Sequence, residues 1–188
     1  QPSFDECDKK LPDSHGLNAI PAPRGVWSNG EKLIVASGDS HRLLVWETFP
    51  ISSTQEPDFQ LGQVSDFLQD ENSGQVSTNQ NGFRNPYAIG GNDYQICLPD
   101  NTNHRVLVWS NLPESNSDLA DIVIGQSTFD KSGYNDTDQD GSGEITPSAK
   151  TLSGPKSCDM SLEQLFILDA NNNRALIYNA LNKRPTSN

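Results

Sequence analysis

Three stretches of the chain are near copies of one another: HRLLVWETFP (41–50), HRVLVWSNLP (104–113) and NRALIYNALN (173–182). When they are aligned on Arg42, Arg105 and Arg174, a proline lies 19 residues before each arginine, with an apolar run between the two. The first two copies are 63 residues apart and the last two are 69 apart. A period of this size predicts an array of similar supersecondary units stacked on one another.

One copy contains four short strands in the sequence pattern. In the second copy these are residues 85–91, 93–100, 104–111 and 120–126, with the turn Asn-Thr-Asn at 101–103. The apolar runs are continuous, which is typical of strands covered on both faces. Asparagine tolerates the left-handed backbone of tight turns. We therefore expect an all-β fold, a β-propeller built from four-stranded antiparallel blades.

The repeat also divides the chain. We expect a single propeller segment with a blade tail at 1–22, blades at 23–67 and 86–129, an incomplete blade at 155–188 and an acidic insertion at 134–147. The chain has no initiator methionine and opens within what aligns with a closing strand, so it looks trimmed. About three blades are half of a six-bladed ring, and rings usually have four to eight. Either a second copy or a missing half of a longer chain would close the ring.

The order of these features resembles the NHL repeat. The shared elements are a proline, a strand, an Asn/Asp turn, His/Asn-Arg, an apolar run and an aromatic residue, and the closing segment ADIVIGQ (120–126) is similar to bacterial secreted members. Ser37 departs from the pattern where the other copies have Asp100 and Asp169, and Asn173 replaces the histidine. The resemblance implies a propeller, but propellers carry many unrelated functions.

Composition excludes some partners. The 188 residues carry a net charge of −12, whereas nucleic-acid binding needs clustered lysine and arginine. No stretch of 18 apolar residues occurs, so the sequence predicts no membrane span. The abundance of polar loops, the acidity and the resemblance together favour an extracytoplasmic location, which means secreted, periplasmic or on the cell surface.

The three cysteines are Cys7, Cys97 and Cys158. Two of them take positions that hold apolar residues in other copies (Cys97 aligns with Ile34 and Phe166, and Cys158 with Val26 and Ile89). We therefore expect both to be small buried apolar side chains, rather than members of a disulfide or a metal site. Cys7 lies in a polar loop, and the odd count leaves at least one thiol unpaired within the chain.

The sharpest local motif is acidic and lies in the insertion. Carboxylates at alternate positions are followed by a glycine and then by further oxygen side chains (Asp136, Asp138, Asp140, Gly141, Ser142 and Glu144). This spacing resembles the first part of an EF-hand calcium loop, although Pro147 stands where the bidentate glutamate would be. We predict Asp136, Asp138, Asp140, Ser142 and Glu144 as Ca²⁺ ligands. The alternative is a solvated acidic loop without an ion.

Other candidates recur with the repeat. His41 and His104 occupy equivalent positions, and some NHL-type propellers are lyases that bind zinc through histidines. Recurrence favours a packing role instead. The one other histidine, His15, lies outside the repeat position, so we do not expect a zinc triad within one chain. The arginines are expected to bond loop carbonyls or the aspartates. Trp27 does not recur and could present an exposed indole to a sugar or a peptide.

Two functions follow from these patterns. The first is a non-enzymatic binding or structural propeller module with a calcium-binding loop, no catalytic residues assigned, and a protein or carbohydrate ligand. The alternative is a metal-dependent lyase or hydrolase of the propeller type, with its site at the channel mouth. An ion on the central axis would favour the enzyme, whereas an ion only in the acidic loop would favour the binding module.

Overall fold

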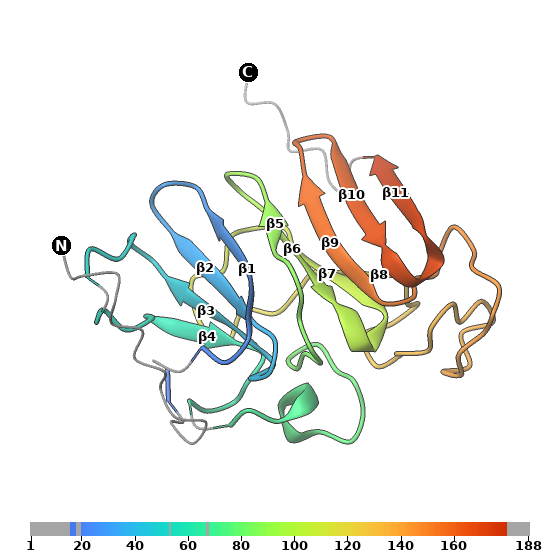
Figure 1. Ribbon diagram of the computed structural model, residues 1–188, viewed down its shortest axis with the longest axis horizontal. Helices are drawn as coiled ribbons and strands as arrows, with labels where there is room; N and C mark the ends of the chain where they lie inside the picture. The colour runs from blue at the N-terminus through green and yellow to red at the C-terminus, as the bar shows by residue number, and fades with distance from the viewer. Residues whose placement is uncertain (1–15, 18–19, 53, 67, 180–188) are drawn as a thin grey trace.

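The computed structural model describes residues 16–17, 20–52, 54–66 and 68–179. Three antiparallel sheets follow one another along the chain (Figure 1). The first contains β1 (Pro23–Ser28), β2 (Leu33–Ser37), β3 (Arg42–Trp46) and β4 (Phe59–Leu61) in that order. The second contains β5 (Gly90–Gly91), β6 (Ile96–Asp100), β7 (Arg105–Trp109) and β8 (Ile122–Ile124). The third contains β9 (Pro155–Met160), β10 (Gln164–Asp169) and β11 (Arg174–Asn179).

The prediction of an all-β fold with four-stranded antiparallel sheets is confirmed. In the described part of the chain the only helical segments are three 3₁₀ turns, η1 (Glu71–Gly74), η2 (Asn101–Asn103) and η3 (Ala170–Asn172). The turns η2 and η3 lead into His104 and Asn173, whose φ angles are 52° and 51°. Left-handed backbone is rare outside glycine and most accessible to asparagine, aspartate and histidine. The turn chemistry of the repeat therefore fixes where each third strand begins.

One strand is shorter than the sequence pattern indicates. The segment 85–91 forms only an isolated bridge from Pro86 to Asp100 and then the two-residue strand β5. Between them Tyr87 donates its N–H to the carbonyl of Pro99, at 3.0 Å. Pro99 has no backbone N–H, so it cannot donate a hydrogen bond back to the neighbouring strand. The ladder of backbone hydrogen bonds is therefore interrupted at this point.

The sheets stack face to face, as the blades of a propeller do. We call the face of each sheet that looks toward the next sheet along the chain its forward face, and the opposite one its rear face. Between the first two sheets lies a core of fully or nearly fully buried residues (Ile34, Ala36, Leu43, Val45, Leu61, Phe83, Ile89, Ile96, Leu98, Leu107, Trp109 and Ala120). A second core fills the next interface (Cys97, Val106, Val108, Leu152, Cys158, Met160, Leu165 and Ile167). Small residues allow close approach on the inner strands, since a Cβ at Gly25 would lie 2.7 Å from Ala88 Cα.

The repeat arginines are structural, as expected. Arg105 is fully buried and pairs with the buried Asp100 at 2.8 Å, and its remaining N–H groups donate to the carbonyls of Asn79, Gly82 and Phe129. Arg174 pairs with Asp169 in the same way, at 2.8 Å. Buried ions are tolerated when paired and hydrogen-bonded in this manner. In the first sheet, where serine replaces the aspartate, Arg42 donates to Gln60 and to loop carbonyls instead.

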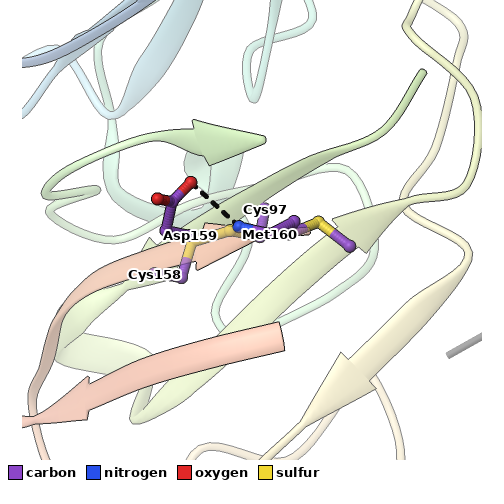
Figure 2. The surroundings of a disulfide bond; sticks show 4 residues. All are labelled: Cys97, Cys158, Asp159 and Met160. Atoms are coloured by element: carbon purple, nitrogen blue, oxygen red, sulfur yellow. Dashed lines mark hydrogen bonds between the residues drawn. A yellow bond between two sulfur atoms is a disulfide. The ribbon is translucent and has the colours of Figure 1, made fainter. Parts of the chain in front are cut away.

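The expectation for two of the cysteines was wrong in part. Both are buried, but Cys97 on β6 and Cys158 on β9 form a disulfide with a Cα–Cα distance of 6.2 Å (Figure 2). The alignment placed each cysteine within its own repeat, whereas the pairing depends on how neighbouring sheets stack. Cys97 lies on a forward face and Cys158 on the rear face that covers it. Cys7 lies outside the described residues.

Candidate functional site

The acidic insertion leaves and rejoins the fold at two fixed points. The Asn135 N–H donates to the Leu152 carbonyl at 2.9 Å. In the preceding repeat the same bond joins Asn72 N–H to the Phe83 carbonyl at 2.8 Å. Leu152 follows Asn135 by 17 positions, whereas Phe83 follows Asn72 by 11. The additional residues therefore all fall between Asn135 and Leu152, and the rest of the sheet connection is unchanged.

Within the insertion the structure brings three of the predicted ligands together. Carboxylate oxygens of Asp136, Asp138 and Asp140 all lie within 4.8 Å of one another. Asp136 is fully buried and the other two are exposed. The Asp136 oxygens accept the N–H groups of Asp140 (3.1 Å) and Gly141 (2.8 Å). Asp138 Oδ1 accepts the Asp140 N–H at 3.2 Å, so the backbone wraps around the cluster.

The two other predicted ligands take different positions. Ser142 donates its N–H to Asp140 Oδ1 at 2.6 Å. Glu144 turns back on the loop, and its Oε2 accepts the Thr137 N–H at 3.0 Å. The group of close carboxylates among the described residues therefore comprises the three aspartates without Glu144. Gly141, with φ of +100°, makes the turn after Asp140 that lets the chain return.

The start of the insertion is tied firmly to the third sheet. The side-chain amides of Asn135 and Asn172 bond each other in both directions, at 3.0 and 2.8 Å. Asn172 also donates to Asp169, at 2.7 Å, which in turn holds Arg174. Asn135 is 4% exposed, so the Asn-Asp-Thr glycosylation sequence that it begins is closed to an enzyme in the folded protein.

The side chain of Gln139 crosses the insertion. It accepts the Ser127 N–H at 2.6 Å through Oε1 and donates to the Asp136 carbonyl through Nε2. In the preceding repeat the hydroxyl of Ser73 accepts the equivalent N–H, that of Val64, at 3.1 Å. The inserted loop thus replaces a hydrogen bond of the repeat with one from Gln139, and this bond ties the insertion to the segment that follows β8.

The two histidines join neighbouring sheets. His41 Nδ1 accepts the Asn85 N–H at 2.9 Å, and His104 Nδ1 accepts the Gly154 N–H at 3.0 Å. Burial lowers the pKa of both imidazoles below the ordinary value. A neutral ring with an unprotonated Nδ1 is what these two bonds require. Each histidine thus serves as a link between sheets, as recurrence in the repeat indicates.

A row of side chains crosses all three sheets and was missed by the sequence reasoning. Arg24, Tyr87 and Lys156 each lie 18 positions before a repeat arginine. The Arg24 guanidinium lies 4.8 Å from the centre of the Tyr87 ring, and the Lys156 ammonium lies 5.4 Å from it. Cations near the ring face of tyrosine are attracted by its quadrupole. The shared repeat position was the signal that could have identified this row.

The row lies at the end of the sheets that carries the turns and the acidic insertion. Pro23, beside Arg24, pairs with the end of β2, and Pro155, beside Lys156, pairs with the end of β10. Arg24 also bonds Asp39 in the β2–β3 turn, at 3.4 Å. This end of the molecule therefore combines a carboxylate cluster with an aromatic ring between two cations.

A cavity of about 350 Å³ opens between the first and second sheets. Phe83 and Trp109 lie at its apolar side, and the amides of Gln80, Asn81 and Asn116 contribute to the polar side. Asp118 is the one charged residue among the described residues that line it. The hydrogen bond from the Glu114 N–H is the main cause that lowers the pKa of Asp118. The lining thus offers hydrogen bonds to a polar ligand.

Trp27 does not present an exposed indole. It is partly buried and packs against the core between the first two sheets, so the expected sugar or peptide contact has no support there. None of the helical segments in the described part of the chain has the length and apolar character that a bilayer crossing requires.

Comparison with known proteins gives structural similarity alone. The chain matches no protein-family model and no curated protein. Among solved structures it is similar to a virginiamycin B lyase from Staphylococcus aureus, with 7% identity, a TM-score of 0.38 and 90% of this chain covered. It is also similar to a streptogramin B lyase, with 10% identity, a TM-score of 0.38 and 89% of this chain covered. The chain spans 45% and 58% of the length of these two proteins.

Proposed function

We propose that this chain is part of an NHL-type β-propeller that acts as an extracytoplasmic binding or structural module, with a Ca²⁺ ion held by residues 136–144. The observation that carries the proposal is the convergence of the Asp136, Asp138 and Asp140 carboxylates within 4.8 Å. Three carboxylates this close repel one another, and a bound cation would relieve this repulsion. Oxygen ligands at this spacing suit a hard cation.

The hydrogen bonds of the loop are compatible with a bound ion. The two oxygens of an ionised carboxylate offer about four lone-pair sites, and the N–H groups of Asp140 and Gly141 use one site on each oxygen of Asp136. Lone pairs therefore remain on this buried ligand for a cation. Ser142 and Glu144 complete the proposed set at the seventh and ninth positions, and the ninth position commonly acts through a water molecule.

The anchoring of the loop supports a site that is formed before the ion binds. Asn135, next to Asp136, is held by Asn172, and Gln139 bonds Ser127 in the segment that follows β8. A preformed loop loses less conformational freedom on binding. Pro147 replaces the bidentate glutamate, so we expect weak affinity, on the order of 10⁻⁴–10⁻³ M as in extracellular calcium modules.

The disulfide supports the proposed location. Bonds such as Cys97–Cys158 persist in oxidising compartments and are rare in the cytosol. The proposed ligand, a protein or a carbohydrate, would bind at the end of the sheets that carries the insertion and the Arg24–Tyr87–Lys156 row. A tyrosine flanked by cations suits an acidic group on such a ligand.

Calorimetric titration with CaCl₂ tests the metal site. We expect about one ion per chain for the parent protein and at least a tenfold weaker affinity for Asp138→Ala. Asp93→Ala, an exposed aspartate outside the insertion, is the matched control and should bind as the parent does. Equal calcium binding by the parent and Asp138→Ala would refute the proposed site. A parallel titration with MgCl₂ should give little heat, because Mg²⁺ demands stricter octahedral geometry.

A further inference from the structure

Two cations from different sheets converge on one tyrosine. Arg24 on β1 and Lys156 on β9 lie 4.8 and 5.4 Å from the centre of the Tyr87 ring, which belongs to the segment that leads into β5. The chain has 13 lysine and arginine residues against 25 aspartate and glutamate residues. Two of these few cations share one ring although like charges repel each other. A bound acidic group would relieve this repulsion.

The Arg24 side chain owes its position to a glycine. A Cβ at residue 38 would collide with Arg24 Nε, so Gly38 leaves room for the guanidinium against the β2–β3 turn. The aligned residues in the other two sheets are Asn101 and Ala170. Arg24 is also paired with Asp39 at 3.4 Å, which compensates part of its charge. Arg24 is therefore a positioning residue that holds the Tyr87 ring from the side of the first sheet.

The Lys156 ammonium and the Tyr87 hydroxyl are available to a ligand. Lys156 is exposed, and no carboxylate of the described part of the chain lies within ion-pair distance of it. The Tyr87 hydroxyl likewise has no hydrogen-bond partner among the described residues. A phenolic O–H and an ammonium both donate to an ionised carboxylate. The two groups thus offer two donors to one carboxylate.

An amide side chain beside these donors favours a sugar over a peptide. Asn101 donates its side-chain N–H to the Pro155 carbonyl at 3.1 Å, and Pro155 precedes Lys156 on β9. Asn101 Oδ1 has no hydrogen bond to the part of the chain that the structure describes, so it remains an acceptor. A cation beside a neutral acceptor suits a ligand with a carboxylate and a hydroxyl close together. A uronic acid carries both groups on one ring, whereas an acidic peptide side chain carries the carboxylate alone.

We propose that the row binds an acidic sugar, with the sugar carboxylate on Lys156 and the Tyr87 hydroxyl. A neighbouring sugar hydroxyl donates to Asn101 Oδ1. The net charge of −12 repels long polyanions, so the row suits a short acidic sugar or the end of a chain. This inference rests on the proposed binding function, for which it names the ligand class, and it does not involve the calcium site. Each contact joins sheets that the structure describes, so it does not depend on what precedes or follows them.

Heteronuclear NMR titration with digalacturonate tests the row. The buffer contains EGTA to remove calcium and about 0.15 M NaCl to screen distant charges. We expect shift changes at Tyr87 and Lys156, and roughly tenfold weaker binding by Lys156→Gln, which loses a charge-assisted hydrogen bond. Tyr87→Phe keeps the ring and should show a similar loss. Lys150→Gln is the matched control, because it removes an exposed lysine outside the row, and it should bind as the parent does.

Two further ligands identify the source of the carboxylate. The dimethyl ester of digalacturonate lacks the charge, and a capped diglutamate peptide carries carboxylates without sugar hydroxyls, so neither should shift the row as digalacturonate does. Equal binding of either ligand would overturn the proposal. So would a parent protein that does not bind digalacturonate, or equal binding by Lys156→Gln and Lys150→Gln.

The same variants separate this inference from the proposed calcium site. Titration with CaCl₂ should give the parent result for Lys156→Gln, because Lys156 lies outside residues 136–144. Calcium binding without digalacturonate binding would overturn the sugar site alone, and the reverse result would overturn the calcium site alone. Because Lys156 is exposed, loss of folding is not expected, and unchanged NMR shifts away from the row verify it.

Discussion

His41 and His104 each hold a backbone N–H of the following sheet through a neutral ring nitrogen. The sign of the pH effect follows from the lowered pKa of both rings, which is caused mainly by burial. As pH falls below about 6.5, the ordinary value, the unfolded chain takes up protons before the folded protein does. The contribution of the two histidines to stability is therefore fully present above that pH. It is lost as the pH falls toward their lowered pKa values in the folded protein.

We expect the free energy of unfolding to decrease between pH 7.5 and pH 5.5. Urea denaturation at the two pH values measures this change. The matched variant is His41→Asn/His104→Asn, because Asn173 occupies the equivalent position with nearly the same φ, 51°. The variant should be less stable at pH 7.5 and should show a shallower dependence on pH. The same dependence in both proteins would mean that other groups are responsible.

For individual residues, the sequence predicted contacts within one loop. It missed contacts that form only when neighbouring sheets pack together. The aspartates at 136, 138 and 140 come together because alternate residues of one tight loop point inward, and spacing alone indicates this. The bond from Thr137 to Glu144 depends on the path of the loop, which spacing does not define. The Arg24–Tyr87–Lys156 row joins three repeats, so it becomes visible only when the sheets are placed.

Among the elements, β6 and β9 carry the one covalent link between sheets in the described part of the chain. Elsewhere the interfaces depend on apolar packing and on hydrogen bonds such as those accepted by His41 and His104. A crosslink between residues 61 positions apart restricts the unfolded chain, and this restriction stabilises the native state by roughly 2–4 kcal/mol. The third sheet should therefore be the part whose attachment responds to reduction.

We expect dithiothreitol to lower the free energy of unfolding of the parent protein by roughly 2–4 kcal/mol, as measured by urea denaturation. The control is Cys97→Ile/Cys158→Ile, which places at this interface the pair that Ile34 and Ile89 form at the first. Its stability should not respond to dithiothreitol. If dithiothreitol left the stability of the parent protein unchanged as well, the disulfide would not contribute to the free energy of unfolding.

The strands themselves were predictable because each apolar run and each turn acts locally. The apolar runs before and after each repeat turn predicted the strands β2, β3, β6, β7, β10 and β11. The shortening of β5 also has a cause in the sequence, because the neighbouring strand contains Pro99. This effect could not be predicted without the strand register, which places Pro99 beside Tyr87. The disulfide required the register between sheets as well.

For the whole molecule, the stack makes stability depend on what covers its outer faces. If a second copy covers them, folding and association are linked, and the melting temperature rises with protein concentration. In that case the increase would be about 1–3 °C for each tenfold rise in concentration, as measured by differential scanning calorimetry. Phe166→Asp, which places a charge on the exposed third forward face, should remove this dependence. A parent melting temperature that is independent of concentration would argue against assembly.

The placement of the disulfide has a further consequence for the acidic insertion. Residues 136–144 lie inside the loop of chain that the bond between Cys97 and Cys158 closes. Several of them are exposed and so are accessible to a protease. A single cut there leaves the two fragments on one covalent molecule, and they separate only after reduction. The exposed loop can therefore be nicked without release of the third sheet.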